Sequence, residues 1–286
     1  MVARTFAVGD IHGELGHLRA LIDTFPTLKK DDKIVFLGDY IDRGPHSAEV
    51  IAYVRTELPQ SIPAKIVCLR GNHEDAWLHV LRIGWDAFVA PPSNGCLQTL
   101  RSFSGRHTDY GPPTDEEKAA MYAGSFFPKD VVAWMKALPY WHEDEHAIYV
   151  HAGIPPVEGK FPHPRELSDP TPLLWIRTVE FFKDYRGKRV IFGHTTTDTL
   201  PQELSSYTPD DPTDLYAGEA VIGIDTGCGR GGFLTAIELP DENVYESRPL
   251  SSAGRDGVSR GKRRCVSAPS PRLSGARSAR SVSHWP

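Results

Sequence analysis

Six short apolar segments of this chain each lead directly into a turn of glycine and polar residues. The turns are Gly-Asp-Ile-His-Gly after Val8, Gly-Asp-Tyr-Ile-Asp-Arg-Gly after Leu37, Arg-Gly-Asn-His-Glu after Leu69, His-Ala-Gly after Val150, Gly-His-Thr after Phe192 and Asp-Thr-Gly-Cys after Ile224. Short runs rich in Val, Ile and Phe are typical of buried strands. Because ligands gather at the carboxyl ends of strands in open α/β sheets, we expect these turns to form one site.

The order of the predicted elements indicates an α/β layered fold, with sheet buried between helices. The predicted strands are Thr5–Val8, Lys33–Leu37, Lys65–Leu69, Ala147–Val150, Arg189–Phe192, Ala220–Ile224 and Phe233–Leu239. The predicted helices are Leu15–Asp23, Ser47–Leu58, Glu74–Phe88, Asp115–Ala123 and Lys129–Leu138. Three segments rich in loop-forming or charged residues are predicted as loops: Pro91–Pro113, which we expect to be exposed, Pro155–Pro172 and Leu200–Tyr216.

The turns contain most of the chain's metal-ligand residue types. A single aspartate after a strand is ordinarily a turn or capping residue, and a lone histidine is ordinarily structural. Here Asp, His, Asp, Asn, His and His follow one another, each at the end of a strand. This set offers oxygen and imidazole ligands without thiolate, which suits Mn, Fe or Zn. We therefore predict two divalent ions about 3.5–4 Å apart that share one carboxylate.

The first three turns resemble the three signatures of the calcineurin-like metallophosphoesterases. More narrowly, they resemble the PPP-type serine/threonine protein phosphatases in a compact bacterial or phage-like form. The spacing agrees, with 29 residues from Asp10 to Asp39 and 34 from Asp39 to His73. The resemblance extends roughly from Phe6 to Leu239. It implies a layered fold in which two mixed β-sheets pack face to face and are flanked by helices.

The resemblance also implies a metal ligand set. Asp10 and His12 would bind the first ion, and Asp39 would bridge the two. The second ion would be completed by Asn72, His151 and His194. Mn is the expected metal, with Fe or Zn as alternatives, because the same ligands accept all three.

The remaining roles concern the substrate. His73 would be the general acid, oriented by Asp42, and Arg43 would hold the phosphate together with Asn72. The second phosphate-binding arginine of the family most resembles Arg177, which is also readable as a surface charge. The reaction implied is removal of phosphate from phosphoserine or phosphothreonine proteins, with phosphotyrosine as a further substrate, by direct attack of a hydroxide that bridges the ions.

A rival function is that of the symmetrical diadenosine tetraphosphate hydrolases, which share the metal ligands, or of another nucleotide phosphoesterase. Relatives of that type usually lack the second aspartate of the second motif, carry Asp after Gly-Asn-His, and have an aromatic residue after Gly-His. Here these positions are Asp42, Glu74 and Thr195, which favours the phosphatase. A catalytically inactive phosphoprotein-binding module on the same fold is a third hypothesis. It would lack a ligand, and none is missing.

Composition limits the partners and divides the chain. With 32 Lys and Arg against 37 Asp and Glu, the net charge is −5, which disfavours a nucleic-acid partner. Residues 247–286 contain nine basic residues, one acidic residue and ten serines. We predict a single catalytic domain over residues 1–246 and a basic, disordered Ser/Arg-rich tail over residues 247–286. The tail is either a solvated appendage or an arm for an anionic partner.

The same reading predicts a cytoplasmic protein. No apolar run approaches about 18 residues, so no membrane partner is expected, and the N-terminus does not resemble a signal peptide. Four cysteines without a CxxC pair are predicted to be reduced thiols. The chain lacks the Ser-Ala-Pro-Asn-Tyr loop of the eukaryotic phosphatases, so no regulatory subunit is predicted.

Overall fold

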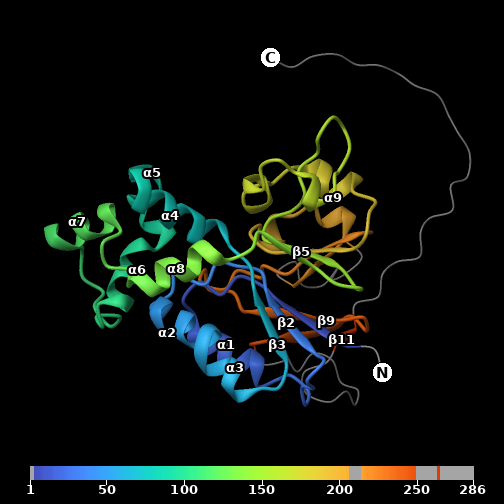
Figure 1. The fold of residues 1–286 in the computed structure, drawn as a ribbon, viewed down its shortest axis with the longest axis horizontal. Coiled ribbons are helices and arrows are strands. Elements are labelled where there is room, and N and C mark those ends of the chain that lie inside the picture. Colours follow the sequence, from blue (N-terminus) through green and yellow to red (C-terminus); the bar gives the residue numbers. More distant parts are fainter. Residues whose placement is uncertain (1–2, 206–213, 249–262, 265–286) are drawn as a thin grey trace, which may run out of the picture.

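The computed structural model describes residues 3–205, 214–248 and 263–264. The strands form two mixed sheets (Figure 1). The first sheet has the order β11 (Arg263–Arg264), β10 (Asn243–Glu246), β9 (Thr235–Leu239), β1 (Thr5–Val8), β2 (Lys33–Phe36) and β3 (Lys65–Cys68). The second has the order β4 (Trp141–Glu143), β5 (Ile148–Val150), β6 (Val190–Phe192), β8 (Val221–Gly223) and β7 (Tyr216–Ala217). All seven predicted strands are present.

Each sheet has a parallel centre with antiparallel neighbours. In the first sheet β1, β2 and β3 are parallel, and β9 is antiparallel to β1. In the second sheet β5, β6 and β8 are parallel. The turns that follow these six parallel strands are those that the sequence singles out, so parallel pairing brings them to a common edge in each sheet.

Alternation of side chains along the strands creates separate cores. In β1, Phe6 and Val8 pack under the helices, whereas Ala7 packs between the two sheets with Val35 of β2 and Ile191 of β6. A strand with both faces buried reads as continuously apolar because successive side chains point to opposite faces. The two sheets therefore pack face to face, as the resemblance predicts.

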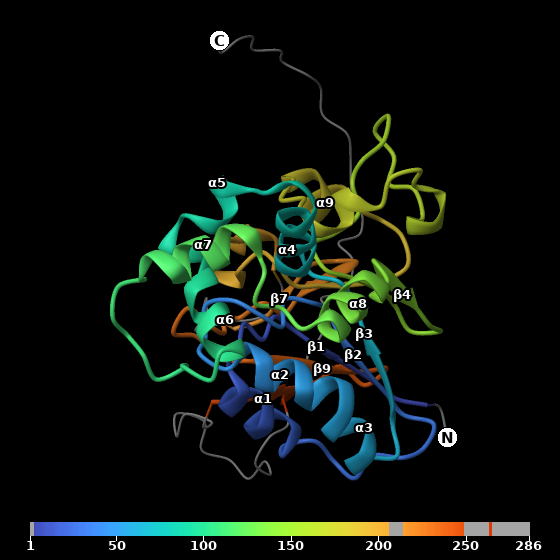
Figure 2. The same cartoon turned by 60° about the vertical axis from the view of Figure 1, so that its left-hand side comes forward.

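Helices cover the outer faces of both sheets. The structure contains α1 (Leu15–Ile22), α2 (Ser47–Ala52), α3 (Leu58–Ser61), α4 (Asn72–Ile83), α5 (Asp86–Val89), α6 (Cys96–Phe103), α7 (Asp115–Ala123), α8 (Lys129–Ala137) and α9 (Val179–Asp184). Figure 1 places α1, α2 and α3 outside the first sheet and α9 outside the second. Figure 1 places α4, α5, α6 and α7 together at one end of the molecule, and Figure 2 shows this group of helices turned toward the front. A π-helical turn, η1 (Tyr53–Glu57), joins α2 to α3. Short 3-10 turns lie in the loops: η2 (Pro92–Asn94), η3 (Pro164–Glu166), η4 (Thr171–Leu174), η5 (Thr197–Thr199) and η6 (Gln202–Leu204).

Two predicted helices differ from the structure. The segment predicted as one helix from Ser47 to Leu58 contains a π-helical turn, η1, between α2 and α3. The helix predicted over Glu74–Phe88 begins earlier, at Asn72, and α4 ends at Ile83. Gly84 follows with φ of 82°, a conformation that glycine adopts without strain and that stops the helix.

The prediction of Pro91–Pro113 as an exposed loop is wrong in its central part. This segment contains α6, in which Cys96, Thr99 and Leu100 are buried. Cys96, Leu97, Leu100 and Phe103 give the helix its apolar face, but the Gly-, Pro- and Ser-rich flanks conceal that periodicity.

Several predictions lie partly outside the described residues. Strand β10 ends at Glu246, the predicted domain boundary, whereas residues 249–262 and 265–286 of the predicted tail are not described. Of the described cysteines, Cys68, Cys96 and Cys228 are free thiols. Within the described part of the chain, the helices are too short or too polar to cross a membrane.

Candidate metal centre

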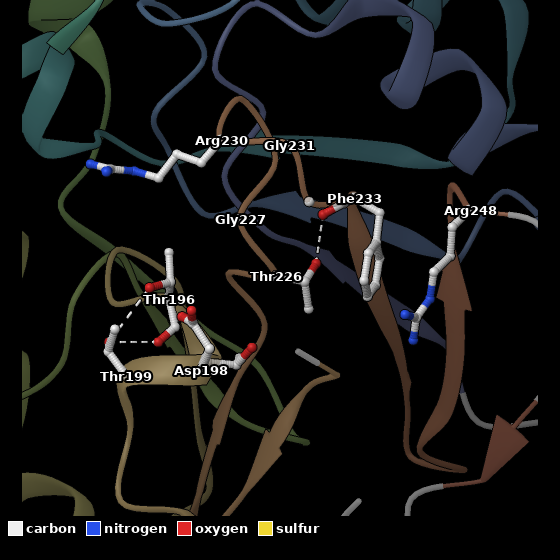
Figure 3. A pocket seen from close by; sticks show the side chains of 11 residues that line it. Thr196, Asp198, Thr199, Thr226, Gly227, Arg230, Gly231, Phe233 and Arg248 are labelled. Atoms are coloured by element: carbon white, nitrogen blue, oxygen red, sulfur yellow. Dashed lines mark hydrogen bonds between the residues drawn. The ribbon is translucent and has the colours of Figure 1, made fainter. Parts of the chain in front are cut away.

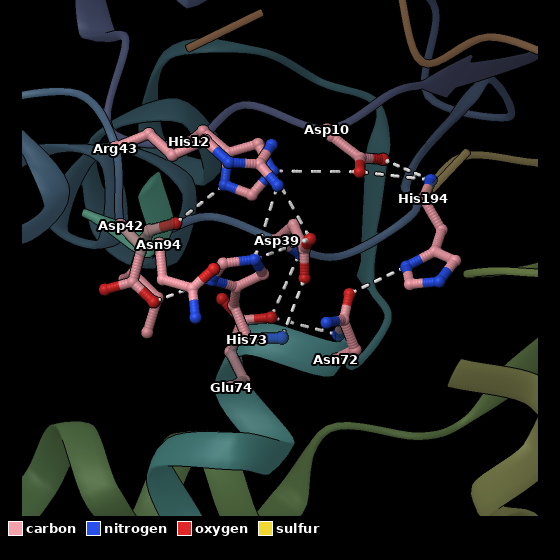
Figure 4. A network of polar contacts seen from close by, with 12 residues as sticks. Asp10, His12, Asp39, Asp42, Arg43, Asn72, His73, Glu74, Asn94 and His194 are labelled. Carbon is pink, nitrogen blue, oxygen red and sulfur yellow. Dashed lines mark hydrogen bonds and ion pairs between the residues drawn. The ribbon is translucent and has the colours of Figure 1, made fainter. Parts of the chain in front are cut away.

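The polar turns converge where the two sheets meet. Asp10, Asp39 and Asn72 come from the first sheet's turns, and His194 comes from a turn of the second (Figure 4). All four side chains are buried. The fold thus brings predicted ligands that are more than one hundred residues apart into one cluster, as the turn pattern predicts.

Asp39 lies at the middle of this cluster. Its Oδ2 is 3.3 Å from Nε2 of His12, and its Oδ1 is 3.5 Å from Nε2 of His151. Asp10 also lies beside His12, and its Oδ2 is 3.9 Å from Nε2 of His12. Two groups of side chains able to hold an ion share Asp39: one contains His12 and His73, and the other contains Asp10 and His151. A carboxylate with one oxygen toward each group is suited to bridging two cations.

Asn72 joins two histidines on the second side. Its Oδ1 is 2.8 Å from both Nε2 of His151 and Nδ1 of His194. Both contacts have hydrogen-bond lengths, so Oδ1 of Asn72 holds the two imidazole rings close together. The predicted second ligand set, Asn72, His151 and His194, is thus brought together.

The histidines are held in a form that can coordinate metal. Nδ1 of His12 contacts the carbonyl oxygen of Ile41, and Nδ1 of His151 contacts that of Leu37, both at 2.9 Å. These contacts orient the rings and direct Nε2 inward. Burial lowers the pKa of both imidazoles, and neutral imidazole is the ligand form.

Buried polar atoms at the centre fit a bound cation. Nε2 of His12, which lies 3.3 Å from Oδ2 of Asp39, is buried and has no hydrogen-bond partner among the described residues. Burial and the neighbouring Asp225 and Asp39 carboxylates raise the pKa of Asp10 well above its usual range. Divalent cations would relieve both conditions, because they supply ligand bonds and compensate the clustered negative charge.

His73 and Asp42 form a buried pair beside this centre. Nδ1 of His73 is 2.7 Å from Oδ2 of Asp42, so Nε2 faces the centre. Burial lowers the pKa of His73, but the Asp39 and Asp42 carboxylates outweigh it, and the net pKa is raised. The arrangement favours an imidazolium that can donate a proton from Nε2.

The two predicted arginines occupy different settings. Nη2 of Arg43 lies 3.5 Å from Nε2 of His73, and its Nε and Nη1 are buried without a hydrogen-bond partner in the described chain. Arg177 is exposed, and its Nη2 donates to the carbonyl oxygen of His194 at 3.4 Å. Both therefore lie beside predicted site residues. Because Arg177 is also exposed, its phosphate-binding role stays a prediction.

The site is built on strained backbone. Seven non-glycine residues in the described chain have positive φ, and five of them are predicted site residues: His12, Asp39, Asp42, Arg43 and His194. This region is sparsely populated by L-residues and is found at functional sites. The turns therefore hold the side chains at a cost that packing elsewhere compensates.

Sequence reasoning missed the residues that support Asp42. Thr99 donates to Oδ1 of Asp42 at 2.6 Å, and Nε1 of Trp77 lies 3.0 Å from both carboxylate oxygens. Trp77 follows His73 by four positions in α4, which places the two on one helix face and could have identified it. Thr99 carried no comparable signal, since its contact is long-range and α6 was not predicted.

Glu74 and Thr195 contribute less to the substrate question than the sequence suggests. The Glu74 carboxylate accepts hydrogen bonds from the backbone N–H groups of Gly71, Asp39 and Tyr40, so it fastens two ligand turns together. Thr195 is buried. Of the three positions that favour a phosphatase, only Asp42 contacts a predicted catalytic side chain.

A third arginine, Arg230, also lies near the centre and was not predicted. The charge of Arg43 lowers its pKa, which is consistent with their proximity. Arg230 comes from the turn after β8, which also carries the buried Asp225. Its position in a glycine-rich turn after a strand was the available signal.

This chain belongs to the calcineurin-like phosphoesterase family, whose model matches residues 3–198. It is a metallophosphoesterase. It is 24% identical to a symmetrical bis(5'-nucleosyl)-tetraphosphatase of Nitrosospira multiformis, over 85% of this chain and 94% of the relative. It is 25% identical to a protein of the same name from Vibrio campbellii, over 86% of this chain and 99% of that relative.

Solved structures share the fold. A cold-active protein-tyrosine phosphatase of a psychrophilic Shewanella species has a TM-score of 0.50 at 16% identity, over 86% of this chain and 78% of that one. A structure whose name suggests a diadenosine tetraphosphatase has a TM-score of 0.50 at 21% identity, over 85% of this chain and 92% of that one. At these identities the likeness concerns the fold alone.

Proposed function

We propose that this metallophosphoesterase removes phosphate from phosphoserine and phosphothreonine residues of proteins. The observation that carries the proposal is the 2.7 Å contact between His73 and Asp42. An alkoxide from serine or threonine is a poor leaving group and needs a proton as it departs. A nucleoside phosphate leaves more easily, so a dedicated acid is less valuable to a nucleotide hydrolase.

The ligands of two divalent cations would be those that the turns bring together. Asp10, His12 and Asp39 would hold one, and Asp39 would join a second set to hold the other. That second set is Asn72, His151 and His194. When bound, such cations supply Lewis acidity and an acidic water at neutral pH. The metal that fits by ligand chemistry is Mn, Fe or Zn.

The protein's own groups would act on the phosphate and on the leaving group. Arg43 presents buried guanidinium N–H groups that lack partners in the described chain, and these suit phosphate oxygens. Arg177 would approach from the side of His194. His73, kept protonated by Asp42, would deliver its Nε2 proton to the departing oxygen.

A second candidate is hydrolysis of symmetrical dinucleoside tetraphosphates. The names of the relatives favour it. So does a cavity of about 610 Å³ lined by the Thr196–Thr199 segment and the turn from Gly227 to Phe233, with Arg230 on one side and Arg248 on the other (Figure 3). Arg230 at the edge of such a space suits the additional phosphates of a long polyphosphate, whereas Arg248 is paired with Glu246 at 2.9 Å and with Asp214 at 3.5 Å.

One assay separates the candidates. With Mn²⁺ added, phosphate release from a phosphothreonine peptide is compared with cleavage of diadenosine tetraphosphate, and each is repeated with EDTA. We expect higher kcat/KM on the peptide and loss of activity with EDTA. Dominant dinucleotide cleavage would replace the first candidate with the second. In that case Arg230→Gln should raise KM for the dinucleotide more than KM for p-nitrophenyl phosphate.

A further inference from the structure

A second group of metal-ligand side chains lies outside the centre. His46 immediately precedes α2, Glu49 lies within α2, and His107 lies in the loop between α6 and α7. One ligand atom from each lies within 4.8 Å of the other two. We propose that His46, Glu49 and His107 form a transition-metal site, suited to Zn²⁺, that fastens the loop after α6 to α2.

The distances are close to those of a coordinated ion. Oε1 of Glu49 is 3.6 Å from Nδ1 of His46 and 3.7 Å from Nδ1 of His107. Ligand atoms about 2.0–2.1 Å from a tetrahedral Zn²⁺ are roughly 3.3 Å from one another. The two contacts to Glu49 therefore need to shorten by only a few tenths of an ångström. The ligand atoms of the two histidines lie within 4.8 Å of each other, and rotation of the partly exposed imidazoles would close the rest. The imidazole rings, with centroids 5.0 Å apart, already face the same carboxylate.

The donor set matches zinc chemistry. Two imidazoles and one carboxylate form a known zinc ligand set that leaves a fourth position for water. All three side chains are about one-third exposed, so an ion can enter from solvent. The identity of the donors, and not their negative charge, distinguishes this group from an ordinary acidic patch.

Two features of the surroundings point to a ligand. Nδ1 of His107 is buried and has no hydrogen-bond partner among the described residues, although it lies beside Glu49. The other oxygen of Glu49 accepts a 2.8 Å hydrogen bond from Ser102 in α6. That bond orients the carboxylate, as partners of metal ligands usually do.

The neighbouring cationic side chain, Arg106, does not take the place of a metal ion beside Glu49. Arg106 precedes His107, but it is engaged by Asp109 at 2.7 Å and by Glu117 at 3.3 Å. By contrast His163, which contacts Glu143 at 3.0 Å, shares that carboxylate with Arg165 and Lys188. His163 thus provides a matched control, a histidine–carboxylate pair that is already neutralised by cations.

The test counts zinc. The purified chain is equilibrated with Zn²⁺, desalted and measured by inductively coupled plasma mass spectrometry, for wild type, His107→Ala and His163→Ala. We expect three equivalents for wild type and His163→Ala and two for His107→Ala. Zinc should also raise the Tm of wild type more than that of His107→Ala, by about 5 °C at a hundredfold excess over Kd.

An Asp39→Asn background separates this site from the metal centre. If centre metals are lost there, one zinc should remain, and adding His107→Ala should remove it. Equal zinc content in wild type and His107→Ala, or no zinc in Asp39→Asn alone, would overturn the proposal. The three residues would then form two ordinary histidine–carboxylate contacts that share Glu49. Activity plays no part in the readout, so failure of the proposed function leaves this result interpretable.

Discussion

Thr99 donates a 2.6 Å hydrogen bond to Asp42, the carboxylate that also contacts His73. Thr99 lies in α6, so this bond connects α6 through Asp42 to His73, the predicted proton donor. Asp42 also lies 3.0 Å from Nε1 of Trp77, so α4 and α6 both fix its orientation. A carboxylate held from three directions keeps a histidine in one rotamer and one tautomer.

Asp42→Asn should therefore reduce turnover in a way that depends on the leaving group. We expect a loss of about 10²–10³-fold on a phosphoserine peptide and a much smaller loss on p-nitrophenyl phosphate, whose leaving group needs little protonation. Steady-state kinetics on both substrates measures this. Equal losses on the two substrates would contradict a role for Asp42 in proton donation.

Thr99→Val tests the hydrogen bond from Thr99 to Asp42, because valine has nearly the shape of threonine but no hydroxyl. It preserves the shape of the side chain but leaves Oδ1 of Asp42 without this donor, and should cost about 1–2 kcal/mol of stability. We expect a several-fold loss on the peptide, in the same direction as Asp42→Asn and smaller. Chemical denaturation and the same kinetic comparison measure both effects. An unchanged ratio of the two activities would show that Thr99 acts on stability alone.

Metal content should depend differently on the two central carboxylates. Asp39→Asn should lower occupancy at both positions, because Asp39 faces His12 and His151 with different oxygens. Asp10→Asn should affect one position more than the other. Mass-spectrometric metal analysis after Mn²⁺ loading tests this expectation. Two retained ions in Asp39→Asn would remove its proposed bridging role.

The pair of Arg101 and Glu117 should make stability depend on acid pH. The Arg101 guanidinium hydrogen-bonds the Glu117 carboxylate at 2.9 and 3.0 Å and holds the pKa of Glu117 below its usual value. The folded-state pKa is depressed, so this stabilisation is complete above the unfolded pKa near 4.3 and is lost as the pH falls through the folded pKa.

The measurement compares wild type with Glu117→Gln by urea denaturation between pH 7 and pH 3. We expect a difference of about 2 kcal/mol at pH 7 that shrinks below roughly pH 4. If the difference in the free energy of unfolding between the two proteins grows on acidification, the pKa of Glu117 is not lowered by folding. Arg55 and Asp130 form an exposed pair, so Asp130→Asn serves as a control with little effect at either pH.

Gly95→Ala should displace Arg43, whose backbone packs directly against Gly95. Gly95 has φ of 75°, and a Cβ there would meet the backbone nitrogen of Arg43 at 2.0 Å. We expect more than about 1 kcal/mol of destabilisation and a raised KM for any phosphate substrate. Gly105→Ala, also at positive φ but with nothing within 4 Å, controls for backbone strain alone. Similar KM values in the two variants would exclude the contact.

The sheets and the convergence of the candidate metal ligands were predictable because their signals are local. A buried strand such as β1 is a short apolar run, and Asp10 and His12 follow it within a few residues. The parallel arrangement then brings the turns together, so spacing along the chain was sufficient for this part of the site.

The parts that were missed depend on contacts between distant segments. Helix α6 carries Thr99 to Asp42 across 57 residues, and the Gly-rich sequence before it reads as loop. Arg230 lies near Arg43 only after the second sheet has formed. Short strands such as β4, with three residues, carry too little periodicity to stand out from their surroundings.

The positive φ angles at His12, Asp42, Arg43 and His194 have a consequence for engineering. Each such conformation costs a non-glycine residue on the order of 1 kcal/mol or more, so the centre is where this protein is least optimised for stability. Replacement by glycine would relax the backbone and remove the side chain that the strain positions. Improved thermal tolerance and retained chemistry therefore oppose each other at these turns, and stabilising substitutions should be sought on the outer helices.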